Sequence, residues 1–152
     1  MVIDDDVVLK NVREIFWANG MTCEEGFESV GYRACNGMIH FTERKLKAIM
    51  AKFGVTLDDL KEKDALGKIY GEYQLPMNVG ILLALCDQSR VEFARNLGVS
   101  PGTVTYFLNP DHRPTARMIK KLSKYFNVPA NRLLFGYANV KFELERDKAR
   151  KG

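Results

Sequence analysis

Short apolar segments with helical spacing recur along the chain, and most of them end at a glycine or begin at a capping residue. Between about residues 7 and 19, the apolar residues Val8, Val12, Ile15 and Phe16 lie three or four positions apart. That spacing places them on one face of an α-helix and differs from the alternation typical of a strand. Gly20 follows directly, as is common at the end of a helix. The pattern predicts an all-α fold.

The same reasoning predicts helices in both halves of the chain. Thr22 with Glu25, and Thr56 with Asp59, have the spacing of a capping box, in which each residue bonds to the backbone of the other. The predicted helical segments are residues 7–19, 22–31, 34–41, 43–53 and 56–60, followed by 78–86, 90–97, 101–108, 115–126 and 129–134.

Charge is distributed unevenly between the halves. Residues 1–76 contain 10 Lys plus Arg and 13 Asp plus Glu, a net charge of −3, whereas residues 77–152 contain 13 and 6, a net charge of +7. Residues 61–76 mix charged residues with glycine and proline, which is typical of a connection. We therefore expect two small helical bundles. The expected division is a first domain (1–62), a linker (63–76), a second domain (77–136) and a basic C-terminal extension (137–152).

Two short helices joined by a tight turn are predicted within residues 88–109. Ser89 and Glu92 have capping-box spacing at the start of the first helix. Ala94 is small enough for two helices to cross closely, and Gly98 suits a left-handed turn. Ser100 is placed to cap the second helix, and a proline follows it at the first position, where no N–H is needed.

This segment resembles the helix-turn-helix of the Cro/C1 type, also called the XRE family. The resemblance covers about residues 78–135, including the longer helix 115–126 and the pair Leu133-Leu134. It implies a lambda-repressor-like bundle in which the helix 101–108 enters the major groove of DNA. Val104 and Phe107 would hold that helix against the bundle.

The resemblance also implies two sets of DNA-contacting residues. The outward residues of helix 101–108 would read base edges: Pro101, Gly102, Thr103, Thr105 and Tyr106. Residues at helix ends and in the following loop would contact phosphates: Ser89, Arg90, Ser100, Asn109 and Arg113. Family members usually have long polar side chains where this chain has Pro101-Gly102. Direct base reading is therefore expected to be sparse, with methyl contacts and DNA shape adding to it.

The function implied is a non-enzymatic regulator of transcription that binds double-stranded DNA in sequence-specific fashion. We expect a repressor from a bacterium or phage, acting without a cofactor as a homodimer on a palindromic or repeated operator. The alternative is a protein-binding module on the same bundle, such as an antirepressor, antitoxin or inhibitor. A DNA reader should lose binding when Arg90 and Tyr106 are changed, whereas such a module need not.

The first half shares its order of elements with the second. Lys52-Phe53-Gly54-Val55 is similar to Tyr125-Phe126-Asn127-Val128, which indicates a weak internal repeat of some 73 residues. Phe27 replaces the small residue expected before Gly31, and Gly37 replaces a buried aliphatic residue. We therefore expect a diverged copy that serves dimerisation or another protein contact. A tandem DNA reader stays open, with three outward residues: Arg33, Asn36 and His40.

Other classes of protein have little support. His40 and His112 are isolated, and no metal-binding or catalytic motif occurs around them. The cysteines Cys23, Cys35 and Cys86 are odd in number and contain no Cys-x-x-Cys, so we expect reduced thiols packed in the interior and no zinc site. The sequence has neither a secretory signal nor an apolar run long enough for a membrane span, which places the expected protein in the cytoplasm.

Overall fold

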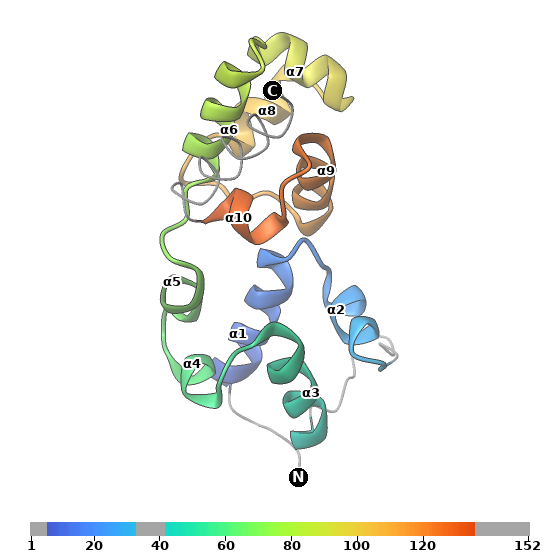
Figure 1. Cartoon of the computed structure of the whole chain (residues 1–152), viewed down its shortest axis with the longest axis vertical. Coiled ribbons are helices and arrows are strands. Elements are labelled where there is room, and N and C mark those ends of the chain that lie inside the picture. Colours follow the sequence, from blue (N-terminus) through green and yellow to red (C-terminus); the bar gives the residue numbers. More distant parts are fainter. Residues whose placement is uncertain (1–5, 33–41, 136–152) are drawn as a thin grey trace, which may run out of the picture.

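The computed structural model describes residues 6–32 and 42–135. Within these ranges the chain forms ten α-helices, and an isolated antiparallel bridge joins Tyr73 and Phe135. The all-α fold class is thereby confirmed. The helices are α1 (Asp6–Ala18), α2 (Cys23–Ser29), α3 (Glu43–Phe53), α4 (Leu57–Lys61), α5 (Ala65–Tyr70), α6 (Leu75–Leu85), α7 (Arg90–Leu97), α8 (Pro101–Phe107), α9 (Ala116–Phe126) and α10 (Ala130–Leu134), as Figure 1 shows.

Local capping explains where most of these helices begin and end. The capping boxes predicted at Thr22 and Thr56 both form. Gly98 ends α7 with a left-handed φ of 82°. At Ser89 only one of the two hydrogen bonds of the predicted capping box forms. The Ser89 oxygen accepts the Glu92 backbone N–H at 3.1 Å, but the Glu92 carboxylate accepts the Ser89 hydroxyl at 3.2 Å instead of the Ser89 backbone N–H.

The segment expected to be a linker contains regular structure. Helix α5 lies inside residues 63–76 and packs against α1 through its buried residues Ala65 and Leu66. Helix α6 begins at Leu75, before the predicted start at residue 78, because Pro76 is tolerated in the first turn of a helix. The predicted helix 34–41, Gly37 and the extension 137–152 lie outside the described residues, as do Arg33, Asn36 and His40.

A buried asparagine ties the first helix of each half to the last short helix of that half. Asn11 in α1 is fully buried and donates from Nδ2 to the Leu60 carbonyl oxygen of α4 at 2.7 Å. Asn78 in α6 is equally buried and donates to the Leu133 carbonyl oxygen of α10 at 2.8 Å. A buried N–H donor is costly without an acceptor, so the Nδ2 bond of each asparagine favours its own helix pair, although both Oδ1 atoms are buried without a partner among the described residues. The two halves are therefore built in the same way at this point.

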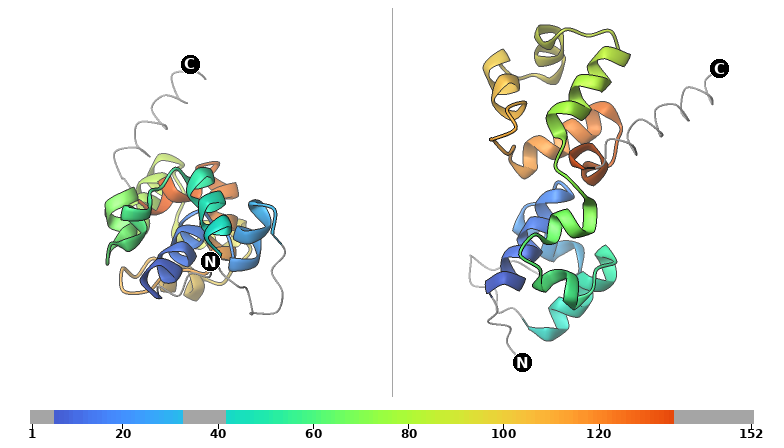
Figure 2. Two further views of the ribbon diagram at one scale, coloured as in Figure 1. Left: turned by 90° about the horizontal axis from the view of Figure 1, so that it is seen from below. Right: turned by 90° about the vertical axis from the view of Figure 1, so that its left-hand side faces the viewer.

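The halves meet in a cluster of aromatic rings. Trp17 of α1 lies 6.0 Å from Tyr73 and 6.4 Å from Phe135, measured between ring centroids. Asn131 of α10 donates to the Asn19 side chain at 2.9 Å across the same junction. Figure 2 shows the end of α1 reaching α10, the last described helix of the second half. One apolar core cluster extends through both halves.

Gly26 allows α2 to approach α1 closely. A Cβ at this position would lie 2.4 Å from the ring of Phe16, which is fully buried and also packs against Phe27 and Phe53. Gly26 therefore has the small-residue role that the sequence pattern had assigned to position 27. We expect Gly26→Ala to lower the free energy of unfolding by about 1–3 kcal/mol, because the overpacked ring must move.

Gly80 in α6 provides a matched control for this substitution. Apart from its chain neighbours and the backbone of its own helix, no heavy atom of the described residues lies within 4 Å of the Cβ that an alanine would add at Gly80. Gly80→Ala should therefore raise the free energy of unfolding by about 0.5–1 kcal/mol through helix propensity alone. Urea denaturation of both variants measures the difference, and a Gly26→Ala protein as stable as wild type would show that α1 and α2 are not in such close contact.

Tyr73 has a buried hydroxyl with no hydrogen-bond partner in the described part of the chain. Burial raises the pKa of Tyr73 to about 12 from its ordinary 10.0, although the positive charge of Arg113 opposes the shift. Because the folded-state pKa is the higher one, ionisation of Tyr73 costs no stability below about pH 10.0, and the free energy of unfolding falls as the pH rises from there to about 12.

Tyr73→Phe should therefore have two measurable effects. Near neutral pH it is expected to raise the free energy of unfolding by about 1 kcal/mol, because an unpaired buried hydroxyl is removed. It should also reduce the loss of stability that wild type shows in alkaline solution. Urea denaturation at neutral pH and near pH 11 measures both effects. The same alkaline loss in the two proteins would mean that another group is responsible.

Candidate nucleic-acid interface

Helices α7 and α8 pack against each other on either side of the turn that begins at Gly98. The side of α7 that carries Phe93, Ala94 and Leu97 is buried, and so are Val104 and Phe107 of α8. Helix α9 packs against α7 and completes the bundle. Because the buried side chains determine how α8 is rotated, the opposite side of α8 faces solvent.

The five residues predicted to read bases lie together on that outward side. Pro101, Gly102, Thr105 and Tyr106 are exposed, and Thr103 is half-buried. Both threonine hydroxyls already have partners: Thr105 donates to the Pro101 carbonyl oxygen at 3.1 Å, and Thr103 shares a 2.9 Å hydrogen bond with the hydroxyl of the N-cap serine. The Tyr106 side chain, at 54% exposure, is the one large exposed hydrophobic group among these five.

His112 belongs to the same surface, although the sequence analysis treated it as an isolated histidine. Its ring stacks on Tyr106 with a centroid distance of 4.2 Å and an interplanar angle of 12°. Its Nδ1 is buried and has no hydrogen-bond partner among the described residues. The stacked ring restricts the orientation of Tyr106. The signal in the sequence was the position of His112 in the loop that directly follows α8.

Four of the five predicted phosphate-contacting residues are exposed at the ends of α7 and α8. Ser89 and Ser100 are the N-caps of these helices, and Arg90 is the first residue of α7. Asn109 follows α8, and its Oδ1 accepts the Asp111 backbone N–H at 2.9 Å. That bond uses the acceptor oxygen of the exposed Asn109 amide and leaves its Nδ2 group out of this contact. Helix starts and exposed amide donors of this kind suit the binding of anions.

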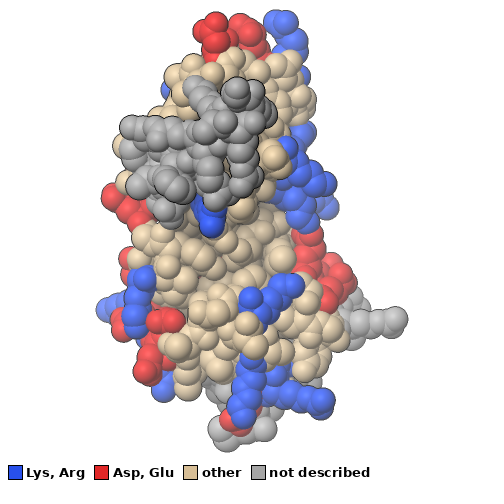
Figure 3. All heavy atoms as spheres, in the orientation of Figure 1, with Lys and Arg blue, Asp and Glu red and all other residues tan. Residues whose placement is uncertain are grey.

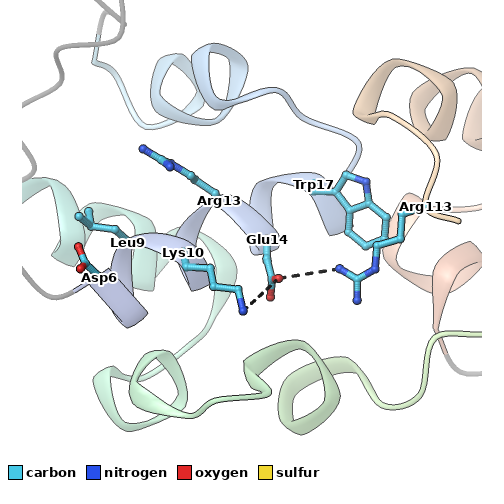
Figure 4. A pocket seen from close by; sticks show the side chains of 7 residues that line it. All are labelled: Asp6, Leu9, Lys10, Arg13, Glu14, Trp17 and Arg113. Carbon is cyan, nitrogen blue, oxygen red and sulfur yellow. Dashed lines mark ion pairs between the residues drawn. The ribbon is translucent and has the colours of Figure 1, made fainter. Parts of the chain in front are cut away.

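The fifth residue, Arg113, lies against the first half of the chain. Its guanidinium carbon lies 5.0 Å from the centroid of the Trp17 ring and 5.9 Å from that of Tyr73. Its Nη1 atom is 3.8 Å from Oε1 of Glu14, and Figure 4 shows this contact reaching from the loop to α1. The Trp17 indole N–H also donates to the carbonyl oxygen of Pro114 at 2.7 Å.

A cavity of about 470 Å³ opens along α1 beside this contact. Its lining residues are Asp6, Leu9, Lys10, Arg13, Glu14, Trp17 and Arg113, as Figure 4 shows. Lys10 Nζ lies 4.0 Å from the same Glu14 oxygen that faces Arg113. The lining therefore combines three cationic side chains with two carboxylates around one aromatic ring.

Basic residues also gather on α9, which contains no acidic residue. Figure 3 shows Lys and Arg side chains at the level of α9 and acidic side chains just below them at the level of α2. Lys120 of α9 forms an ion pair with Glu25 of α2 across this boundary. The other basic residues of α9 are Arg117, Lys121 and Lys124, all exposed. Much of the positive charge in the described second half therefore lies on one helix.

Two further findings concern the remaining chemistry. In residues 6–32 and 42–135, no group of three His, Cys, Asp or Glu side chains could hold a metal ion, and no helix is long and apolar enough to cross a membrane.

Cys23 and Cys86 are exposed free thiols, so the interior packing predicted for them is wrong. Cys23 begins α2 and Cys86 ends α6, and both ends face solvent. Cys35 lies outside the described residues.

Comparison with protein-family models matches residues 87–133 to the family described as Helix-turn-helix, of the Cro/C1 or XRE type. The match covers α7, α8, α9 and most of α10, which are the elements that build the surface described above. The chain therefore carries a Cro/C1-type helix-turn-helix domain. Domains of this type are found in DNA-binding regulators, in which the second helix of the motif lies in the major groove. No curated protein and no solved structure matches this chain.

Proposed function

We propose that this protein is a transcriptional repressor of a bacterium or phage that binds a specific double-stranded DNA operator as a homodimer in the cytoplasm. The observation that carries the proposal is the outward side of α8. It presents the five predicted base-reading residues together and lies within the matched helix-turn-helix domain. Capped helix starts on either side of it can meet the DNA backbone.

Base reading in this proposal depends on Tyr106 more than on hydrogen-bonding side chains. The hydroxyls of Thr103 and Thr105 are already bonded within the domain, and Pro101 and Gly102 have no long polar group. The Tyr106 ring, supported by His112, can contact a thymine methyl group. The small residues at the start of α8 allow the helix backbone to approach the groove floor, so DNA shape contributes to specificity.

Arg90 and Asn109 supply phosphate contacts on the two sides of α8, and Ser89 and Ser100 add backbone N–H groups at the starts of α7 and α8. The exposed cations of α9 add a long-range attraction for the polyanion. Contacts of this kind position the domain on DNA without selecting a sequence.

We further propose that the first half, residues 1–62, is a diverged copy of the second domain, residues 77–136, and that it forms the dimer. The matched asparagine bonds of Asn11 and Asn78 support a common origin. The helices α3 and α9 also end alike, with left-handed φ values of 66° at Gly54 and 54° at Asn127. The net charge of −3 in residues 1–76 favours a protein contact over a DNA contact for this half.

Selection of duplexes from a randomised pool tests the proposal, with no metal or cofactor added. We expect the selected sequences to contain two inverted half-sites whose centres lie about 10 base pairs apart, as a symmetric dimer requires. A selected single half-site would contradict the dimer. A pool that stays random would contradict sequence-specific binding and favour the alternative, a protein-binding module built on the same fold.

A further inference from the structure

Arg113 belongs to the loop that follows α8, yet the partners found for its guanidinium lie in or next to the first half. The guanidinium lies over the Trp17 ring of α1 and faces Glu14 one turn earlier on the same helix. Next to Arg113, the Pro114 carbonyl oxygen accepts the Trp17 indole N–H. Trp17 and Pro114 are 97 residues apart in the sequence, so this loop contacts a distant part of the chain. The first half thus contacts a residue that the sequence resemblance predicts to bind a DNA phosphate.

The two contacts of Arg113 differ in kind. The Arg113 guanidinium carbon lies over the Trp17 ring, 5.0 Å from its centroid, and the indole N–H bond anchors the adjacent Pro114, which is buried. The attraction in this contact is between the positive charge and the ring, so it does not use the guanidinium donors in hydrogen bonds to oxygen atoms. Trp17 therefore positions the Arg113 side chain and does not occupy its hydrogen-bond donors.

The Glu14 carboxylate, in contrast, faces Nη1 of the Arg113 guanidinium, where a phosphate group could bind instead. The pair is loose: the Nη1 to Oε1 distance is 3.8 Å, and 54% of the Arg113 side chain and 25% of the Glu14 side chain are exposed. The same carboxylate oxygen also faces Lys10 at 4.0 Å. A phosphate group can form two short parallel hydrogen bonds with a guanidinium, which is a stronger interaction than this contact.

We propose that Glu14 competes with a DNA phosphate for Arg113, so that the first half lowers the affinity of the second half for DNA. In free protein Glu14 neutralises Arg113, and on binding a backbone phosphate replaces it while Trp17 keeps the guanidinium in place. Glu14 is therefore a negative determinant of DNA affinity that lies outside the helix-turn-helix domain. The inference rests on the proposed function, because it requires that duplex DNA is the ligand.

A double-mutant cycle on the full chain tests this competition. Affinity for the selected duplex is measured by fluorescence anisotropy for wild type, Glu14→Gln, Arg113→Ala and the double variant. Glu14→Gln is expected to bind about two- to fivefold more tightly than wild type, the factor typical of one partly exposed ion pair. In the Arg113→Ala background the same substitution should have no effect, because its target is gone.

Glu24→Gln is the matched control, since it removes one negative charge from an exposed position on α2. Its affinity should equal that of wild type. The chain contains one tryptophan, so the emission of Trp17 reports whether the contact between α1 and the loop is intact in each variant. An unchanged emission maximum in Glu14→Gln is expected.

Three results would overturn the inference: Glu14→Gln binding no more tightly than wild type, an equal gain from Glu24→Gln, or an equal gain in the Arg113→Ala background. Each of them leaves the proposed function intact as long as wild type binds the duplex. Failure of wild type to bind any duplex would instead refute the proposed function, and this inference with it.

Discussion

Replacing Tyr106 with alanine is expected to weaken duplex binding about 10- to 100-fold, because one well-placed contact to a base contributes about 1–3 kcal/mol. Tyr106 is the large exposed hydrophobic side chain on the outward side of α8, and it is already oriented by His112. The fold should be retained, since substitution of an exposed residue usually changes the free energy of unfolding by no more than about 0.5 kcal/mol. Fluorescence anisotropy with the selected duplex measures the effect.

Tyr106→Phe separates the ring from the hydroxyl. This variant keeps the stacking on His112, so its affinity should stay within about threefold of wild type if the ring makes the contact with DNA. A loss as large as that of Tyr106→Ala would assign the contact to the hydroxyl. A Tyr106→Ala protein that binds DNA as wild type does would show that this side of α8 does not enter the groove.

Phe93→Ala should have the largest effect on stability, lowering the free energy of unfolding by about 3–5 kcal/mol. The Phe93 side chain is fully buried, and its ring lies 5.3 Å from Tyr125, 5.4 Å from Phe126 and 6.3 Å from Phe107. Its removal leaves a cavity between α7, α8 and α9. Because small proteins are stable by only about 5–15 kcal/mol, a large part of the stability would be lost.

Val91 in the same helix provides the control for this prediction. Its side chain is 56% exposed, so Val91→Ala should change the free energy of unfolding by no more than about 0.5 kcal/mol. Urea denaturation followed by circular dichroism measures both variants. A Phe93→Ala protein that lost less than about 1 kcal/mol would show that the three helices do not depend on this ring.

Local features of the fold could be predicted from the sequence because they depend on residues close together. The capping threonines Thr22 and Thr56 and the left-handed Gly98 are confirmed, since each bonds within three or four residues of its own position. Helix α5 could not be predicted. Its Ala65 and Leu66 are too few to establish a period, and the helix is stabilised by packing on α1.

The candidate site could be predicted in part for the same reason. Val104 and Phe107 are buried as predicted from their spacing within one helix, so the outward residues of α8 were predictable as a group. The environment of Arg113 was not, because Trp17 and Glu14 lie in another half of the chain and no local pattern relates them to it. The exposure of Cys23 was not predicted. The expectation of burial rested on the general tendency of free cysteines to pack in the interior, whereas Cys23 is exposed at the first position of α2.

Binding of duplex DNA through the face that carries α8 is measured by fluorescence anisotropy over a series of salt concentrations. Wild type is compared with the Arg90→Ala, Arg113→Ala double variant on a labelled duplex. We expect wild type to bind with an affinity that falls steeply as salt rises, and the variant to bind more weakly with a slope of log affinity against log salt that is shallower by about 2. Absence of binding at low salt, or equal binding by the two proteins, would contradict this mode of binding.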